Sequence, residues 1–203
     1  SVMPMSIVGG LFFIFGFVTW LNGALIPFLK TACELDHMEA YLVTMSFYIA
    51  YTVMALPVSV ILRKTGYKNG MMLGLLIMAI GALMFIPAAN ERAYSLFLLA
   101  LFVLASGLTL LQTAANPYIV LLGPRETAAV RISIMGLLNK SAGIIAPLIF
   151  TALVFSDMGQ FSEDKLALLS AQDKLTALND LSARLINPYI YLTIVLSVLA
   201  LAI

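Results

Sequence analysis

Six apolar stretches, each close to the roughly 20 residues that cross a bilayer core, constrain this chain more than any other feature. They run at about residues 4–29, 40–62, 69–89, 94–122, 128–155 and 188–203. Hydrophobic residues fill 62% of the 203 positions and charged residues 10%, against roughly 25% charged in soluble domains. The sequence therefore predicts an all-α integral membrane protein whose six helices span the lipid bilayer.

The Lys and Arg residues of the connections predict which way the helices face. Basic residues gather after the second stretch, at Arg63, Lys64 and Lys68, and after the fourth, at Arg125. The long polar connection at about residues 157–187 is acidic instead. We expect the N-terminus on the cytoplasmic side of the plasma (inner) membrane, and the long connection outside as short helices that cover the bundle or bind a partner. Since no polar flank follows the sixth stretch, we also expect a fragment of a longer protein.

Several classes of function are excluded by composition. A net charge of +1 without a long basic run argues against a nucleic-acid partner. Cys33 is the only cysteine, so neither an internal disulfide nor a cysteine metal cluster can form. No nucleophile–base pair is found in the apolar stretches, so the sequence predicts no enzyme, no metal site and no cofactor other than a coupling ion.

A polar stripe interrupts the fourth apolar stretch. Thr109, Gln112, Thr113 and Asn116 are spaced i, i+3, i+4 and i+7, which places them on one side of a helix that Pro117 ends or kinks. In hydrocarbon an unpaired amide or hydroxyl costs several kcal/mol, so the stripe needs a polar partner. Both hydrogen bonds between helices and a substrate site in a water-filled cavity fit this pattern.

The first stretch is interrupted in a similar way. Asn22 precedes Pro27 by five residues, as Gln112 precedes Pro117. Interrupted apolar segments at corresponding positions of two halves indicate a transporter binding site. The matched spacing therefore predicts a bundle built as a 3+3 inverted repeat.

Such a repeat would place the first and fourth helices on opposite sides of a cavity. Thr19, Trp20 and Asn22 would then face Gln112 and Asn116. Trp20 could stack on a sugar ring, although a single tryptophan in a span is otherwise a packing residue.

Two further side chains are candidates for the same cavity. Lys140, beside Asn139, lies near the middle of the fifth stretch, where an ammonium group costs about 3 kcal/mol unless it faces a cavity or a partner. It shares one helical face with Ser133, Gly136, Gly143 and Pro147. Alternatively, Lys140 pairs with backbone carbonyls or with a carboxylate from a missing part of the protein. In the second stretch, Tyr48 is the candidate ligand.

Three motifs carry a resemblance to a known family. GFVTWLNGALIP (residues 16–27), the basic turn RKTGYK (63–68) and LQTAANPYIVLLGP (111–124) resemble the N-terminal half of the fucose/galactose/glucose cation symporters of the major facilitator superfamily. The similarity covers about residues 11–155 and resumes at 187. It implies half of a twelve-helix transporter that works by alternating access, with the C-terminal half as partner. It also implies that Arg63, Lys64 and Lys68 form a latch between the halves.

The departures from that family bear on ion coupling. Proton-coupled members carry carboxylates where Gly23 and Gln112 stand, and both are missing here. The resemblance is greater to sodium-coupled glucose and galactose members, which favours Na⁺ over H⁺ and suggests Thr113, Asn116 and Lys140 for ion coupling. Lys140 complicates this assignment, because a fixed positive charge disfavours a second cation nearby.

Three functions fit these observations. The first is secondary active import of a hexose or N-acetylhexosamine, coupled to a cation. The second is transport of an anionic sugar, a uronate or aldonate, with Lys140 as its counter-charge. The third is a membrane scaffold or sensor that transports nothing.

Overall fold

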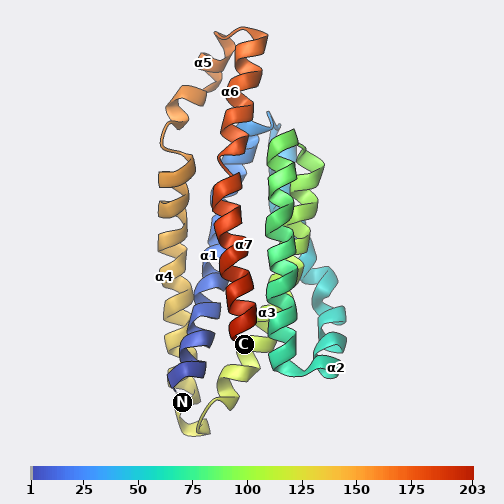
Figure 1. The fold of residues 1–203 in the computed structure, drawn as a ribbon, viewed down its shortest axis with the longest axis vertical. Coiled ribbons are helices and arrows are strands. Elements are labelled where there is room, and N and C mark those ends of the chain that lie inside the picture. Colours follow the sequence, from blue (N-terminus) through green and yellow to red (C-terminus); the bar gives the residue numbers. More distant parts are fainter. Residues whose placement is uncertain (1) are drawn as a thin grey trace.

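The computed structural model describes residues 2–203, and its long helices run along one common direction (Figure 1). These helices are α1 (Val2–Ala32), α2 (His37–Glu91), α3 (Tyr94–Leu121), α4 (Ala128–Val154) and α7 (Ile186–Ala202). The short ones are η1 (Arg125–Thr127), η2 (Met158–Phe161), α5 (Glu163–Ala167) and α6 (Ala171–Ala183). Residues 2–203 contain no strand, so the all-α prediction is confirmed.

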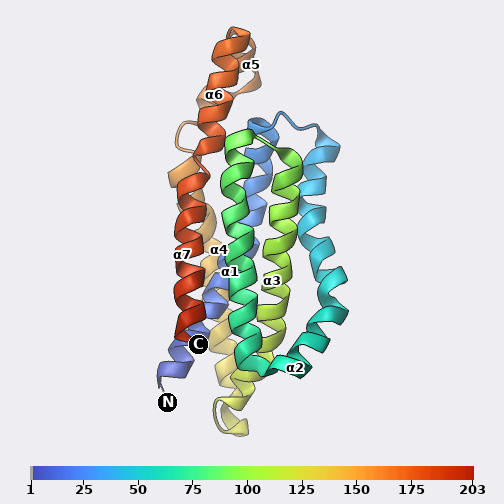
Figure 2. The same cartoon turned by 45° about the vertical axis from the view of Figure 1, so that its right-hand side comes forward.

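Helix α2 contains two spans joined by a sharp turn. Its 55 residues correspond to about 80 Å of helix, well over twice the roughly 30 Å of a bilayer core. At Gly66 the backbone has φ 76° and ψ 173°, a conformation that glycine adopts easily. There α2 folds back on itself (Figure 2). Within residues 2–203, five helical runs are long and apolar enough to cross a membrane, the last of which joins α6 and α7. Because α2 crosses twice, they supply six spans.

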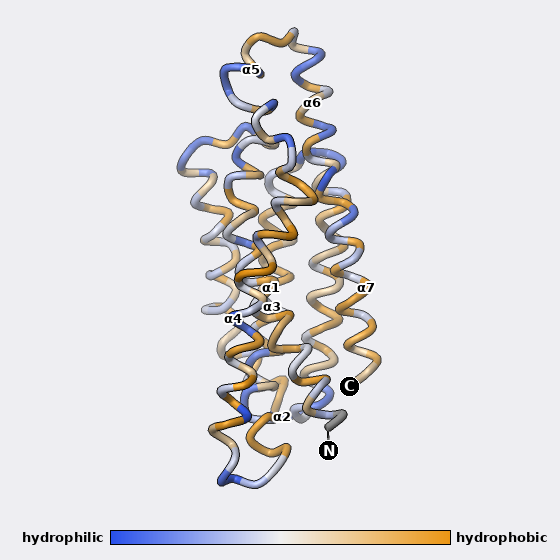
Figure 3. Tube along the Cα trace, turned by 90° about the vertical axis from the view of Figure 1, so that its left-hand side faces the viewer, coloured by the Kyte–Doolittle hydropathy of each residue, from blue (hydrophilic) through white to orange (hydrophobic). Residues whose placement is uncertain are grey.

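The connections fall at the two ends of the bundle. The two chain ends, the α2 turn and η1 lie at one end, and α5 and α6 extend beyond the other (Figure 1). Hydrophobic residues dominate the middle of the bundle and hydrophilic ones its ends (Figure 3). This arrangement matches the six-span topology of the sequence analysis, while the cytoplasmic side of the N-terminus stays a prediction.

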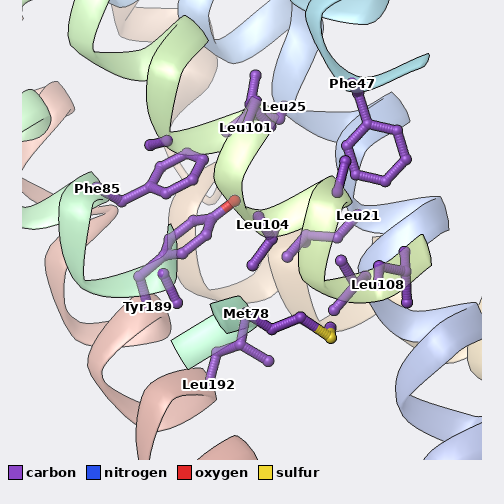
Figure 4. Packing of buried hydrophobic residues seen from close by; sticks show 14 of the residues in the cluster. Leu21, Leu25, Phe47, Met78, Phe85, Leu101, Leu104, Leu108, Tyr189 and Leu192 are labelled. Atoms are coloured by element: carbon purple, nitrogen blue, oxygen red, sulfur yellow. The ribbon is translucent and has the colours of Figure 1, made fainter. Parts of the chain in front are cut away.

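The core is held by close backbone contact and stacked rings. A Cβ atom at Gly107 of α3 would lie 2.6 Å from the Gly74 carbonyl oxygen of α2, so the two backbones touch where neither residue has a side chain. Helix α7 packs on the second limb of α2, where the rings of Phe85 and Tyr189 stack at 3.8 Å (Figure 4). Both contacts join segments distant in sequence.

One buried arginine fixes the turn between α3 and α4. The Arg131 guanidinium donates to backbone carbonyls at the end of α3 and in the turn, those of Ile119, Val120, Gly123 and Pro124, at 3.0–3.3 Å. It also donates to the Thr127 hydroxyl at 2.6 Å. Five bonds use every donor that a guanidinium has. The positive charge of Arg131 also interacts favourably with the negative, carbonyl end of the α3 dipole.

Replacing this guanidinium should destabilise the protein even when the charge is kept. Arg131→Lys cannot supply all five hydrogen bonds, so it leaves some of these buried and partly buried carbonyls without a donor, and a buried unsatisfied group costs about 1 to 3 kcal/mol. We therefore expect a clearly lower melting temperature for the protein in detergent. Arg125→Lys, at an exposed position of the same turn, is the matched control. Equal melting temperatures for the two variants would contradict the role of Arg131.

An ion-pair cluster ties α6 to the end of α1. Glu34, just beyond α1, pairs with Lys174 of α6 at 2.6 Å and with Arg92, at the end of α2, at 3.4 Å. Arg92 also donates to the Ala32 carbonyl at 2.7 Å. The hydrogen bond from Lys174 lowers the pKa of the Glu34 carboxyl, and Arg92 adds to the effect. The cluster thus connects three segments at one end of the bundle.

A lowered carboxyl pKa predicts a defined pH dependence. The stability that the ionised Glu34 gives to the folded state is fully present above the ordinary Glu pKa of about 4.3. It is lost as the pH falls through the lowered pKa of the folded state. Glu34→Gln should therefore expose residues 157–187 to proteolysis equally at pH 7 and at about pH 5, and the difference from wild type should shrink only at more acidic pH. Glu163→Gln, which removes an exposed carboxylate of α5, is the control. A difference already lost near pH 6.5 would contradict this account.

Candidate functional site

Polar side chains from α1, α2 and α3 meet within the membrane-spanning part of the bundle. The Tyr51 hydroxyl of α2 donates to the Gln112 side-chain oxygen of α3 at 3.4 Å. Tyr51 also interacts with the side chain of Thr19 from α1, and the Thr19 hydroxyl donates to the Phe15 carbonyl at 2.6 Å. The three helices are thus joined by neutral polar groups. The amide nitrogen of Gln112 is not used by the Tyr51 contact.

A second group of side chains lies between α1 and α4. Lys140 Nζ is 5.9 Å from the centre of the Trp20 ring, which is cation–π distance. Trp20 rests against Gly143, where a Cβ atom would lie 2.6 Å from the indole nitrogen. Trp20 is nevertheless 48% exposed. At Gly23 and Gly136 an added Cβ would meet nothing within 4 Å, so the space beside the indole and the ammonium is open.

Three more predicted ligands are exposed on α2 and α3. Thr113 and Asn116 point away from the rest of the chain, and Tyr48 is 56% exposed with its ring 6.4 Å from that of Tyr51. The Thr113 hydroxyl donates to the Thr109 carbonyl at 2.7 Å.

Pro117 does not end α3, contrary to one of the two expectations, since the helix continues to Leu121. It does remove the hydrogen bond that the Thr113 carbonyl would otherwise accept.

Asn22 lies in the bundle core, away from these exposed groups. It is 4% exposed and continues a buried row along α1 formed by Leu11, Phe15, Val18, Leu25 and Leu29. Its side-chain oxygen is buried without a hydrogen-bond partner in the described part of the chain. A sugar contact at Asn22 stays a prediction, because it would need α1 to turn or the core to open.

Asn139 has a partner in the packing between helices. Its side-chain nitrogen donates to the Phe12 carbonyl of α1 at 3.2 Å. This bond lies where α1 and α4 approach each other closely, since a Cβ atom at Gly16 would run into the Asn139 carbonyl. The structure therefore gives Asn139 a role in helix contact, and its predicted sugar contact stays untested.

The charges are distributed unevenly over the bundle. All ten acidic residues lie in connections or at helix ends, so Lys140 has no carboxylate beside it within residues 2–203. Arg63, Lys64 and Lys68 are exposed around the Gly66 turn in the middle of α2, at one end of the bundle. They do not contribute to the site, and their latch role stays a prediction. No group of His, Cys, Asp and Glu among residues 2–203 could hold a metal ion.

Tyr51 is the main residue of the site that the sequence analysis did not propose as a ligand. It follows Tyr48 by three residues, which places both on one side of α2. That spacing could have identified it as a ligand candidate. Its bond to Gln112 could not be foreseen, because 61 residues separate the two in sequence.

Comparisons with known proteins agree with this architecture. The Major Facilitator Superfamily profile matches residues 8–161. The glucose/galactose transporter of Brucella abortus is 45% identical over 146 residues, 72% of this chain and 35% of that protein. The L-fucose-proton symporter of Escherichia coli is 32% identical over 202 residues, 100% of this chain and 46% of that protein.

A solved structure extends the comparison to the fold. The crystal structure of the E. coli fucose:proton symporter matches with a TM-score of 0.84 and 30% identity, over 98% of this chain and 48% of that one. This chain thus spans about half the length, or less, of the relatives it matches. The resemblance found in the sequence motifs is confirmed, and the chain belongs to the Major Facilitator Superfamily.

Proposed function

We propose that this chain is one half of a sugar transporter that imports a hexose or N-acetylhexosamine by alternating access. The other half would be a second six-helix bundle facing the exposed sides of Trp20, Asn116 and Lys140. The observation that carries the proposal is that the exposed Trp20 ring and the Lys140 ammonium group lie on the same bundle as the Thr19–Tyr51–Gln112 network. Matches to a glucose/galactose transporter and a fucose-proton symporter support a sugar as substrate.

The chemistry of the site suits a neutral sugar. An indole face covers the apolar side of a pyranose ring, and amide groups exchange hydrogen bonds with its hydroxyls. The half-exposed Trp20 indole supplies the first. Gln112, held by Tyr51, and the exposed Asn116 supply the second. Because Gln112 is already oriented, it loses little freedom when a sugar binds.

We further propose that transport is coupled to a cation, with Na⁺ as the candidate. The spans of this half contain no carboxylate that could carry a proton. Oxygen atoms at Thr113 and Asn116, including the Thr113 carbonyl released by Pro117, could solvate Na⁺ without titrating. The relatives' names do not favour sodium, since one is a proton symporter. Transport measured with a Na⁺ gradient and with a pH gradient therefore identifies the coupling ion.

A second candidate substrate follows from Lys140. Its ammonium reaches Trp20 but no carboxylate within residues 2–203. The carboxylate of a uronate or aldonate would supply the missing counter-charge. A scaffold or sensor without transport is the third alternative, and it predicts that no sugar exchanges across the membrane.

Counterflow into liposomes tests the proposal with the complete transporter. Labelled glucose, galactose, N-acetylglucosamine and glucuronate are offered with a Na⁺ gradient, a pH gradient or neither. We expect exchange of a neutral sugar, and Gln112→Ala should raise its half-saturating concentration about tenfold through loss of a buried polar contact. Ser197→Ala removes an α7 hydroxyl that only bonds its own helix and should change nothing. Absence of counterflow for every sugar would reject transport, and unaltered affinity in Gln112→Ala would reject the site.

Removing the ammonium separates the two substrate classes. For a neutral sugar, Lys140→Met should change the ion or pH dependence of uptake, because the positive charge beside Trp20 is lost. For an anionic sugar, it should abolish binding of the charged substrate and relax the preference toward neutral sugars. Lys140→Arg keeps the positive charge and serves as the control. Full coupled uptake with an unaltered pH profile in Lys140→Met would leave Lys140 as a structural residue.

A further inference from the structure

An apolar groove of about 450 Å³ runs between α4 and α7, with α1 as its floor. In Figure 1, α4 and α7 stand on either side of the lower part of α1. The wall includes Gly10, Phe13, Phe17, Leu153, Tyr191 and Val195. Tyr191 is the only lining residue with a polar side-chain atom. The groove therefore excludes a sugar and suits a hydrocarbon ligand.

The groove and the candidate sugar site lie on opposite sides of α4. Ile149 lines the groove and follows Lys140 by nine residues. Nine residues are about two and a half helical turns, which places the two side chains about half a turn apart. Lys140 faces Trp20, so the groove opens on the other side. This inference is consequently independent of the proposed function.

The length of the groove matches one leaflet of a membrane. Along α7 it extends from Pro188 to Leu199, and along α1 from Gly10 to Leu21. Either run covers about 16 Å at the rise of an α-helix. Half of a bilayer core is about 15 Å thick. Because these helices cross the membrane, a lipid acyl chain in the groove would lie parallel to the acyl chains of the surrounding bilayer.

A positive charge stands at the end of the groove near α6. Arg184 precedes Pro188 by four residues, in the turn between α6 and α7. Its guanidinium donates to the Val154 carbonyl at 3.3 Å, next to the lining residue Leu153. Its pairing with Asp157 is loose, at 3.6 Å, and the Arg184 side chain is 29% exposed. Guanidinium groups bind phosphate oxygens well. We propose that the groove holds an acyl chain of a phospholipid whose phosphate binds Arg184.

Photolabelling of the complete transporter in vesicles tests this site. The probe is phosphatidylglycerol with a diazirine on one acyl chain, in vesicles of unlabelled phosphatidylglycerol and phosphatidylcholine. We expect labelling to concentrate in residues 10–21, 149–153 and 188–199. Val195→Trp fills the groove and should lower labelling about fourfold or more, the factor expected when one buried methylene is displaced. Val198→Trp, at an exposed α7 position outside the groove, should leave labelling unchanged.

A second probe separates the phosphate from the acyl chain. Diacylglycerol with the same diazirine chain should label the groove less than phosphatidylglycerol does, and Arg184→Gln should remove that difference. Lys165→Gln, a charge change in α5 at the same end, is the control. Labelling spread evenly over other exposed apolar residues such as Leu137 and Ile144 would overturn the proposal. So would equal labelling of the two tryptophan variants, or a groove that stays unlabelled because another part of the transporter covers it.

Discussion

Inside a bilayer, each polar group of the chain needs a partner from the chain itself, and this requirement explains most of the polar contacts in the structure. The hydroxyls of Thr19, Thr109 and Thr113 each donate to a carbonyl one turn earlier in their own helix. Arg131 uses all its donors on the turn between α3 and α4. Among residues 2–203, Lys140 and Asn116 are exposed groups without a hydrogen-bond partner, so they need one from outside this chain, whereas the unpaired side-chain oxygen of Asn22 is buried in the core.

Helix α4 separates two surfaces of different chemistry. On one side Lys140 and Trp20 form an exposed polar surface next to the open space at Gly23 and Gly136. On the other side Ile149 and neighbouring side chains form a groove for hydrocarbon. Close contact between Gly16 of α1 and α4 keeps the two surfaces at a fixed relative position. A sugar and a lipid would thus contact the same rigid pair of helices.

The sequence analysis predicted the spans well and the side-chain directions less well. Hydrophobic length identifies a span without tertiary information, and Gly66 lies between the second and third stretches where the turn occurs. Asn22 was expected on the cavity because it is polar, yet it continues the apolar row of Phe15 and Val18 and is buried. The contacts of Tyr51 and Arg131 depend on how helices pack, and a single sequence does not specify that packing.

In the proposed sugar transporter, the exposed polar side of α3 and α4 would line a water-filled cavity. Cysteine accessibility measures this directly in the complete protein, after Cys33→Ser removes the one cysteine of this chain. Thr113→Cys should react with a polar thiol reagent, more slowly when a transported sugar is present, whereas a cysteine at the fully buried Ala115 should not react. An unreactive Thr113→Cys, or a reaction that no sugar slows, would contradict the account.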